Sequence, residues 1–167
     1  MKLVSVKLPS SFESAIAAHK LVMCAEAAAY HQDAFRKKAE LYHPQMSEWI
    51  EAGLKTSAVD YLRAQRIRAE YREELNGLLQ EVDAWLTPTA PTPAPEGLSF
   101  TGSPIFNLPF TNAGVPSLSV PIGFTPDRGL PLGMQMVARA LGEESLLALG
   151  NAYQQATTWH TERPQLN

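Results

Sequence analysis

The stretch from Thr87 to Ala138 decides the fold of this chain, and it reads TPTAPTPAPEGLSFTGSPIFNLPFTNAGVPSLSVPIGFTPDRGLPLGMQMVA. Ten of the 13 prolines of the chain lie in it. Because proline fixes φ and lacks a backbone N–H, we expect residues 87–116 to form a rigid proline-rich loop without helix. Two apolar runs follow, and the turn chemistry of residues 125–129 between them predicts a β-hairpin over residues 117–138.

Alternation along the first run of this hairpin assigns its side chains to two faces. The predicted apolar face consists of Leu118, Val120, Ile122 and Phe124. The opposite face carries small side chains at Ser119, Gly123 and, on the return strand, Gly133. Small residues let another backbone approach closely, so we expect this second face to dock against a further part of the protein.

Residues 1–86 are predicted to be mostly helical, after a short apolar strand over residues 3–8 that Pro9 ends. Apolar spacing and start signals predict helices over residues 12–31, 33–41, 46–52 and 57–82. Ser11 is the expected N-cap of the first of these helices, Gly53 the expected end of the third, and Ser57 with Asp60 resembles a capping box. A strand is expected at residues 84–86, before the loop, and a last helix over residues 143–158.

Length and composition fit one soluble domain over residues 1–167, and the alternation of strands and helices predicts an α/β fold. The formal net charge of -3 gives no reason to expect a nucleic acid or an acidic membrane as a partner. The single cysteine excludes an internal disulfide, and no apolar run is long enough for a signal peptide or a membrane span. We therefore expect a cytoplasmic protein.

Three motifs in a fixed order resemble the C-terminal part of the amidase signature family. They are LTPTAPTPAP at residues 86–95, SPIFNLPFTNAGVPSLSVPIGF at residues 103–124 and LPLGMQMVA at residues 130–138. Upstream, VKLPSSFESAIAAHKLVMCAEAAAYH at residues 6–31 is similar to the helices that precede this loop in such amidases. Several motifs in matching order are much more specific than one short pattern. The resemblance covers nearly the whole chain but only the C-terminal end of a family member.

The resemblance implies a mixed central sheet wrapped by helices, of which this chain forms the C-terminal portion only. It also implies hydrolysis of carboxylic amides through an acyl-enzyme, by a serine nucleophile, a second serine and a lysine that lie in the N-terminal half of the family. A serine hydroxyl needs a base within hydrogen-bond reach. The adjacent pair Ser10-Ser11 has no glycine near it and is interpreted as a helix cap, so no catalytic residue, cofactor or metal is expected in this chain.

A substitute nucleophile is the remaining possibility for catalysis within the chain. Cys24 lies mid-helix among apolar residues, which is typical of an inert buried thiol. His31 would stand about 10 Å further along the helix axis, too far for a thiol–imidazole pair. The other histidines, His19, His43 and His160, show no spacing typical of metal ligands.

By resemblance, residues 102–107 line the acyl side of the substrate cavity. The candidate substrate-binding residues are Ser103, Pro104, Phe106 and Asn107, with Thr87, Thr89 and Gln135 as weaker candidates. In the family members that belong to glutamyl-tRNA amidotransferase, an aspartate at this place holds the amino group of glutamine. Pro104 stands there in this chain, which favours a less polar acyl group. The alternative, that these residues only pack the loop, stays open.

Two functions remain at this stage. In the first, the chain is the C-terminal portion of an amidase, inactive alone, whose partners are an N-terminal catalytic portion, from the same gene or a second chain, and a small amide substrate. In the second, it is a non-catalytic binding or scaffold remnant of an amidase. A part of a larger sheet exposes apolar surface, so self-association is also expected.

Overall fold

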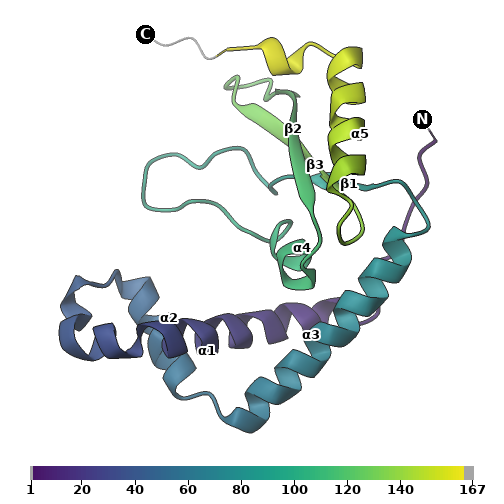
Figure 1. Ribbon diagram of the computed structural model, residues 1–167. Coiled ribbons are helices and arrows are strands. Elements are labelled where there is room, and N and C mark those ends of the chain that lie inside the picture. The colour runs from purple at the N-terminus through teal and green to yellow at the C-terminus, as the bar shows by residue number, and fades with distance from the viewer. Residues whose placement is uncertain (1, 164–167) are drawn as a thin grey trace. The chain divides into compact units, whose positions relative to one another are not determined.

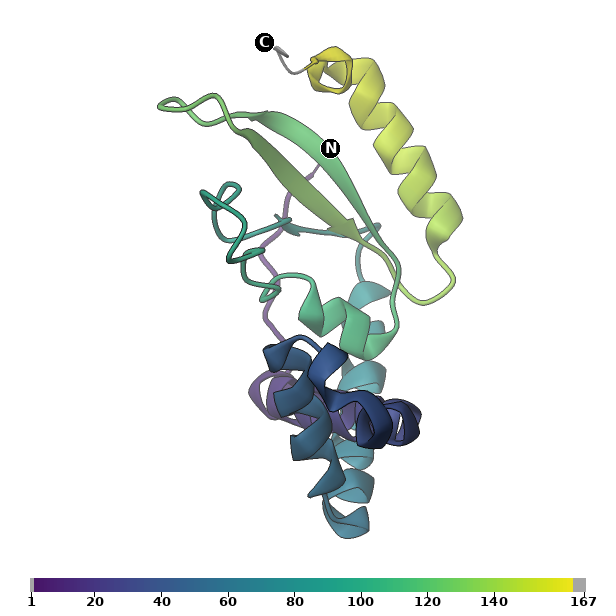
Figure 2. The ribbon, with the colours of Figure 1, turned by 90° about the vertical axis from the view of Figure 1, so that its left-hand side faces the viewer.

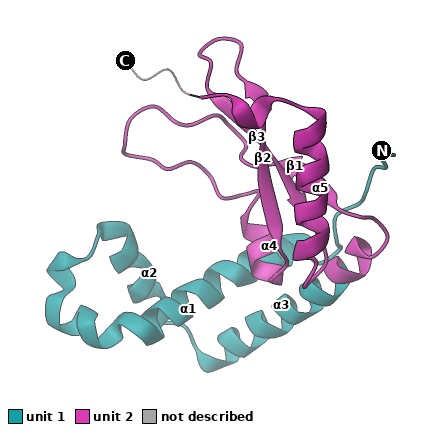
Figure 3. Ribbon diagram, turned by 45° about the horizontal axis from the view of Figure 1, so that its top comes forward, with its two compact units in different colours: residues 1–74 teal, residues 75–167 magenta. Residues whose placement is uncertain are grey.

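The computed structural model describes residues 2–163 of the chain (Figure 1). The helices are α1 (Phe12–Lys38), α2 (Pro44–Leu54), α3 (Ala58–Leu79), α4 (Leu108–Ala113) and α5 (Glu143–Ala156), with short 3-10 turns η1 (Ala39–Leu41) and η2 (Trp159–Thr161). The strands are β1 (Trp85–Pro88), β2 (Ser117–Phe124) and β3 (Pro131–Val137). The chain divides into two compact units, residues 1–74 and 75–167 (Figure 3).

The first unit is built on small side chains of α1. Ala18 and Val22 form a buried cluster with Ala64 of α3, and Leu21, Tyr61 and Ile67 pack against it. Small residues also let α2 lie close to α1, because a Cβ on Gly53 would stand 1.9 Å from the carbonyl oxygen of Cys24. Burial of this apolar stripe between helices is what makes a 27-residue helix stable here.

Several sequence predictions for this unit need correction. The predicted strand over residues 3–8 is wrong, because these residues are exposed and belong to no strand or helix. The helices predicted over residues 12–31 and 33–41 are one helix, α1, followed by η1. Gly53 does not end α2 but lies inside it, where the close approach of Cys24 requires a glycine.

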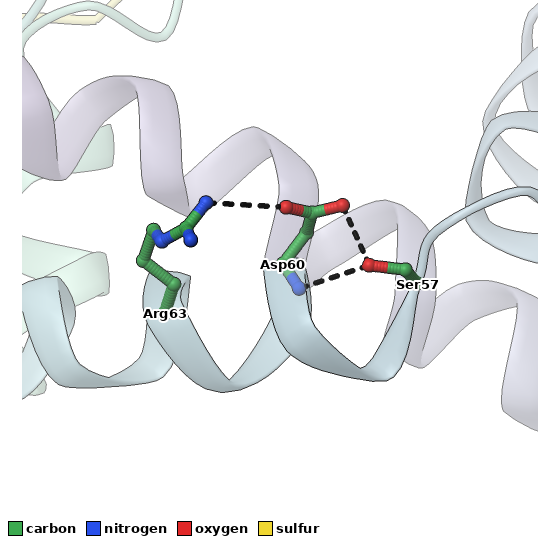
Figure 4. Close-up of polar contacts among 3 residues, drawn as sticks. All are labelled: Ser57, Asp60 and Arg63. Atoms are coloured by element: carbon green, nitrogen blue, oxygen red, sulfur yellow. Dashed lines mark hydrogen bonds and ion pairs between the residues drawn. The ribbon is translucent and has the colours of Figure 1, made fainter.

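The capping box at the start of α3 is confirmed. The hydroxyl of Ser57 accepts a hydrogen bond from the backbone N–H of Asp60 at 3.1 Å and donates to the Asp60 carboxylate at 2.6 Å. Arg63, one turn further on, lies 3.5 Å from the same carboxylate (Figure 4). The backbone donors that a helix start leaves unpaired are thereby partly satisfied.

The second unit contains one antiparallel sheet with strand order β1-β3-β2. The predicted hairpin is confirmed as β2 and β3, and the predicted strand at residues 84–86 is confirmed as β1, which pairs with β3 from Trp85 opposite Val137 to Pro88 opposite Met134. Helix α5 packs along one face of the sheet (Figure 2). The core beneath it consists of Val120, Met136, Ala138 and Leu146.

A β-bulge changes the predicted faces of β2. The register with β3 shifts between Pro121 and Gly123, so Ile122 is the extra residue. Because one extra residue inverts the alternation beyond it, Gly123 lies on the buried side against Trp159, whereas Ile122 and Phe124 are exposed. The predicted small-residue face therefore keeps Ser119 and Gly133 but loses Gly123.

Helix α4 corrects the prediction that residues 87–116 hold no helix. Pro109 lies in its first turn, where no N–H is needed, and Gly114 ends it with φ of 68°. Phe110 and Asn112 are buried, so this turn anchors the loop to the second unit. No helix in the described range 2–163 is long and apolar enough to cross a membrane.

Candidate active-site loop and its support

Gln135 of β3 is the buried polar residue around which the candidate site is built. Its side chain is only 3% exposed, and its amide nitrogen donates to Thr87 Oγ1 at 3.1 Å and to the carbonyl oxygen of Phe106 at 2.9 Å. Thr87 stands directly opposite Gln135 in the sheet. A buried amide must satisfy its donors, so the two bonds connect the sheet firmly to the loop.

The loop that Gln135 holds carries the four predicted substrate residues. Phe106 is half-buried, whereas Ser103, Pro104 and Asn107 are exposed. The carbonyl of Pro104 accepts hydrogen bonds from the N–H groups of Asn107 at 2.9 Å and Leu108 at 2.8 Å, which turns the chain into α4. The four residues therefore lie on one ordered turn between Gln135 and α4, with three of their side chains accessible.

A second polar contact bridges the sheet on the same side as Gln135. The hydroxyls of Thr89 and Ser119 lie 2.8 Å apart, above Gly133 of the middle strand. A Cβ on Gly133 would stand 2.7 Å from Thr89 Oγ1 and 3.1 Å from Ser119 Oγ. Only glycine leaves room for this bridge, which explains why a glycine stands in the middle of a strand.

The chemistry of this region suits binding and not nucleophilic attack. Between residues 87 and 124 the only charged residue is Glu96. The hydroxyls of Thr87, Thr89 and Ser119 contact an amide or each other, and none of these contacts includes a histidine, lysine or carboxylate. A hydroxyl without a base within reach is a poor nucleophile, so the region can bind neutral polar or apolar groups.

The adjacent serines Ser10 and Ser11 bind a carboxylate in the first unit. Both hydroxyls and both backbone N–H groups donate to Glu74. The hydrogen bonds from Ser11 and Ser10 lower the pKa of Glu74 to about 2. A carboxylate of such low pKa is a weak base, so this pair is not an activated nucleophile. Ser11 makes no side-chain bond to the helix, so its predicted N-cap role is wrong.

The other candidate groups have structural roles. Cys24 is buried, and His31 Nδ1 lies 3.1 Å from the hydroxyl of Tyr42. The side chain of His43 caps α2 by accepting from the N–H of Gln45. Within residues 2–163, no three His, Cys, Asp or Glu side chains are grouped so as to hold a metal ion.

A surface hollow of about 400 Å³ lies elsewhere in the second unit. Its lining consists of Leu79, Gln80, Val82 and Arg139. None of the predicted substrate residues belongs to this lining. The sequence named Gln135 and Thr89 as weaker candidates, and it gave no signal for their contacts, because both depend on strand register.

Comparison with known proteins decides the family. The Amidase family matches residues 1–147 of the chain. The chain belongs to the amidase family. An amidase of Pseudomonas putida is 34% identical over 182 aligned positions, which cover 99% of this chain and 38% of that protein. A glutamyl-tRNA(Gln) amidotransferase protein of Nostoc punctiforme is 39% identical over 114 residues, 64% of this chain and 23% of that protein.

Solved amidase structures contain the same fold. A crystal structure of an amidase superposes on 90% of this amidase-family chain with a TM-score of 0.80 and 32% sequence identity, and the match covers 37% of that structure. The chain thus spans less than two fifths of the length of the relatives it matches. Its mixed α/β fold is a portion of the amidase signature fold.

Proposed function

We propose that this chain is the C-terminal portion of an amidase signature hydrolase that cleaves carboxylic amide bonds through a serine acyl-enzyme. The observation that carries the proposal is the extent of the match, 99% of this chain against 38% of the Pseudomonas putida amidase. In the proposal, the nucleophile, the bridging serine and the lysine lie in the remaining portion. The lack of a base beside the hydroxyls of the candidate site supports this division.

In this proposal, the turn over residues 103–107 forms part of the substrate pocket. Phe106 would contact the acyl group of the amide, and the exposed Ile105 beside it adds apolar surface. Ser103 and Asn107 would offer neutral hydrogen-bonding groups. A proline at residue 104 offers no charge to hold an amino group, so the proposed substrate has an apolar acyl group.

The proposed partner is the catalytic portion of the amidase, either in the same polypeptide or in a second chain. Apolar side chains exposed on the turn and strands of the second unit support such a partner, among them Ile105, Ile122 and Phe124. Self-association of isolated chains would be a second consequence of this exposed surface, and light scattering over a range of concentrations measures it.

Labelling with a fluorophosphonate serine-hydrolase probe tests the proposal. The purified chain is labelled beside an extract of its source, and the labelled bands are identified by peptide mass. We expect the 18.3 kDa chain to remain unlabelled, and a larger labelled amidase that contains this sequence or co-purifies with it. Labelling of the isolated chain would contradict the proposed absence of a nucleophile. A chain with no labelled partner would favour a non-catalytic scaffold.

A further inference from the structure

The segment before α1 is anchored firmly at one end. Glu74 accepts four hydrogen bonds, from the N–H groups of Ser10 and Ser11 at 2.7 and 3.1 Å and from their two hydroxyls. Pro9, the next residue toward the N-terminus, is buried. The carboxylate stays ionised because these bonds lower its pKa to about 2. The direction in which residues 2–8 leave the first unit is therefore fixed.

Beyond this anchor the chain is apolar and unpaired. Residues 2–8 read KLVSVKL and belong to no helix or strand in the described part of the chain. Four apolar side chains lie in the open, with 72% of Leu3, 52% of Val4, 47% of Val6 and 59% of Leu8 exposed. Val4, Val6 and Leu8 alternate with Leu3, Ser5 and Lys7, which is the pattern of a strand with one apolar face.

We propose that residues 3–8 are a docking strand that pairs with a strand edge of the catalytic portion of the amidase, an inference that rests on the proposed function. Its main-chain groups would form the ladder, and Val4, Val6 and Leu8 would enter an apolar surface of that portion. Pro9 has no N–H and ends the pairing.

The extent of the family match identifies the partner. The match to the amidase family begins at residue 1, and the match to the Pseudomonas putida amidase covers 99% of the chain, so this segment belongs to the amidase fold. A strand of that fold needs a neighbour, and the described chain supplies none to these residues. The neighbour therefore lies in the remainder of the amidase. A second copy fits less well, since parallel in-register pairing would place Lys7 against Lys7.

The test uses the full chain and a tagged second chain, the part of the Pseudomonas putida amidase that lies outside the match. Hydrogen–deuterium exchange follows the amides of residues 3–8 in the chain alone and in the mixture, and fluorophosphonate labelling follows the activity of the mixture. We expect fast exchange in the chain alone, and exchange slowed by about tenfold or more in a labelled mixture, because ladder N–H groups exchange only on opening.

A proline scan distinguishes strand pairing from general contact. In a strand paired along one edge, alternate N–H groups point to the neighbour. Val4→Pro and Val6→Pro remove one set, and Ser5→Pro and Lys7→Pro remove the other. One set should weaken association about tenfold or more, and the other set much less. Val6→Thr, which keeps the N–H, is the matched control for the apolar face.

Each outcome decides the inference. A labelled mixture in which residues 3–8 exchange freely and all four proline variants bind normally would overturn the docking strand and leave the proposed function standing. A mixture that neither associates nor labels would count against the proposed function and the strand together. The proline variants should melt like the wild-type chain when isolated. A lowered melting temperature would reveal a partner inside the chain and overturn the inference.

Discussion

The side-chain amide of Gln135 lies 2.9 Å from the carbonyl oxygen of Phe106, so a buried residue of β3 holds the turn that carries the predicted substrate residues. The same nitrogen also donates to Thr87 Oγ1. One side chain thereby fixes the position of a loop from two strands. This contact makes the candidate pocket dependent on the sheet register.

Gln135→Met should destabilise the second unit and loosen the turn at residues 103–107. Methionine fills a similar volume but donates no hydrogen bond, and it leaves the carbonyl of Phe106 without its donor. We expect a loss of about 1–3 kcal/mol in the free energy of unfolding. Urea denaturation measures this loss, and faster amide exchange at residues 105–108 reports the loosened turn.

The matched control for this prediction is Gln155→Met on the exposed side of α5. Its effect should stay within about 0.5 kcal/mol. Equal stability of the two variants would show that the Gln135 amide contributes nothing to the position of the loop.

Gly133→Ala should break the bridge between Thr89 and Ser119. The new Cβ would meet Thr89 Oγ1 at 2.7 Å and Ser119 Oγ at 3.1 Å, so one hydroxyl must move. We expect a cost of about 1–3 kcal/mol in thermal unfolding. Thr89→Ala in the same background should recover part of this cost. A double-mutant cycle without coupling would contradict the role assigned to the glycine.

Gly53→Ala and Gly77→Ala should have opposite effects although both glycines are helical. A Cβ on Gly53 would lie 1.9 Å from the backbone oxygen of Cys24, whereas a Cβ on Gly77 meets nothing within 4 Å. Separation of α1 and α2 would cost about 3 kcal/mol or more. Alanine at residue 77 should instead stabilise the chain by up to about 1 kcal/mol through helix propensity. Denaturation of the two variants under one condition tests both signs.

The sequence predicted elements whose signals are local. The hairpin follows from alternation around the turn at residues 125–129, and the start of α3 follows from Ser57 and Asp60. The bulge at Ile122 could not be predicted, because pairing of two strands determines it and their composition does not. Helix α4 was missed because Pro109 was interpreted as a helix breaker, although the first turn of a helix accepts proline.

The candidate site was predictable only as a set of residues. The family resemblance assigned residues 103–107 to the pocket, and their roles in binding stay predictions. Their support by Gln135 comes from contacts 29 and 48 residues apart in sequence, which no local pattern encodes. The strand predicted over residues 3–8 was wrong for the chain as described, because a strand needs a neighbour as well as a pattern.

Ser57→Ala should destabilise the start of α3. The variant loses the oxygen that accepts from the N–H of Asp60 and the hydroxyl that donates to its carboxylate. Loss of an N-cap of this kind costs about 1 kcal/mol. Amide exchange in the first turn of α3 should rise accordingly. Ser99→Ala, in an exposed part of the proline-rich loop, is the control, and equal exchange in both variants would contradict the capping role.

Glu74→Gln should remove a stabilisation that depends on pH. Hydrogen bonds from Ser11 and Ser10 lower the pKa of Glu74 from 4.5 to about 2 in the folded chain, so folding favours the ionised carboxylate. The contribution is therefore complete above pH 4.5 and decreases as the pH falls toward 2. Urea denaturation should show the largest difference between wild type and variant near neutral pH, and a shrinking difference below pH 4.5. Glu73→Gln, an exposed neighbour on α3, should not reproduce this dependence. A difference for Glu74→Gln that stays constant down to the folded pKa would mean that the ionised carboxylate does not hold the segment in place.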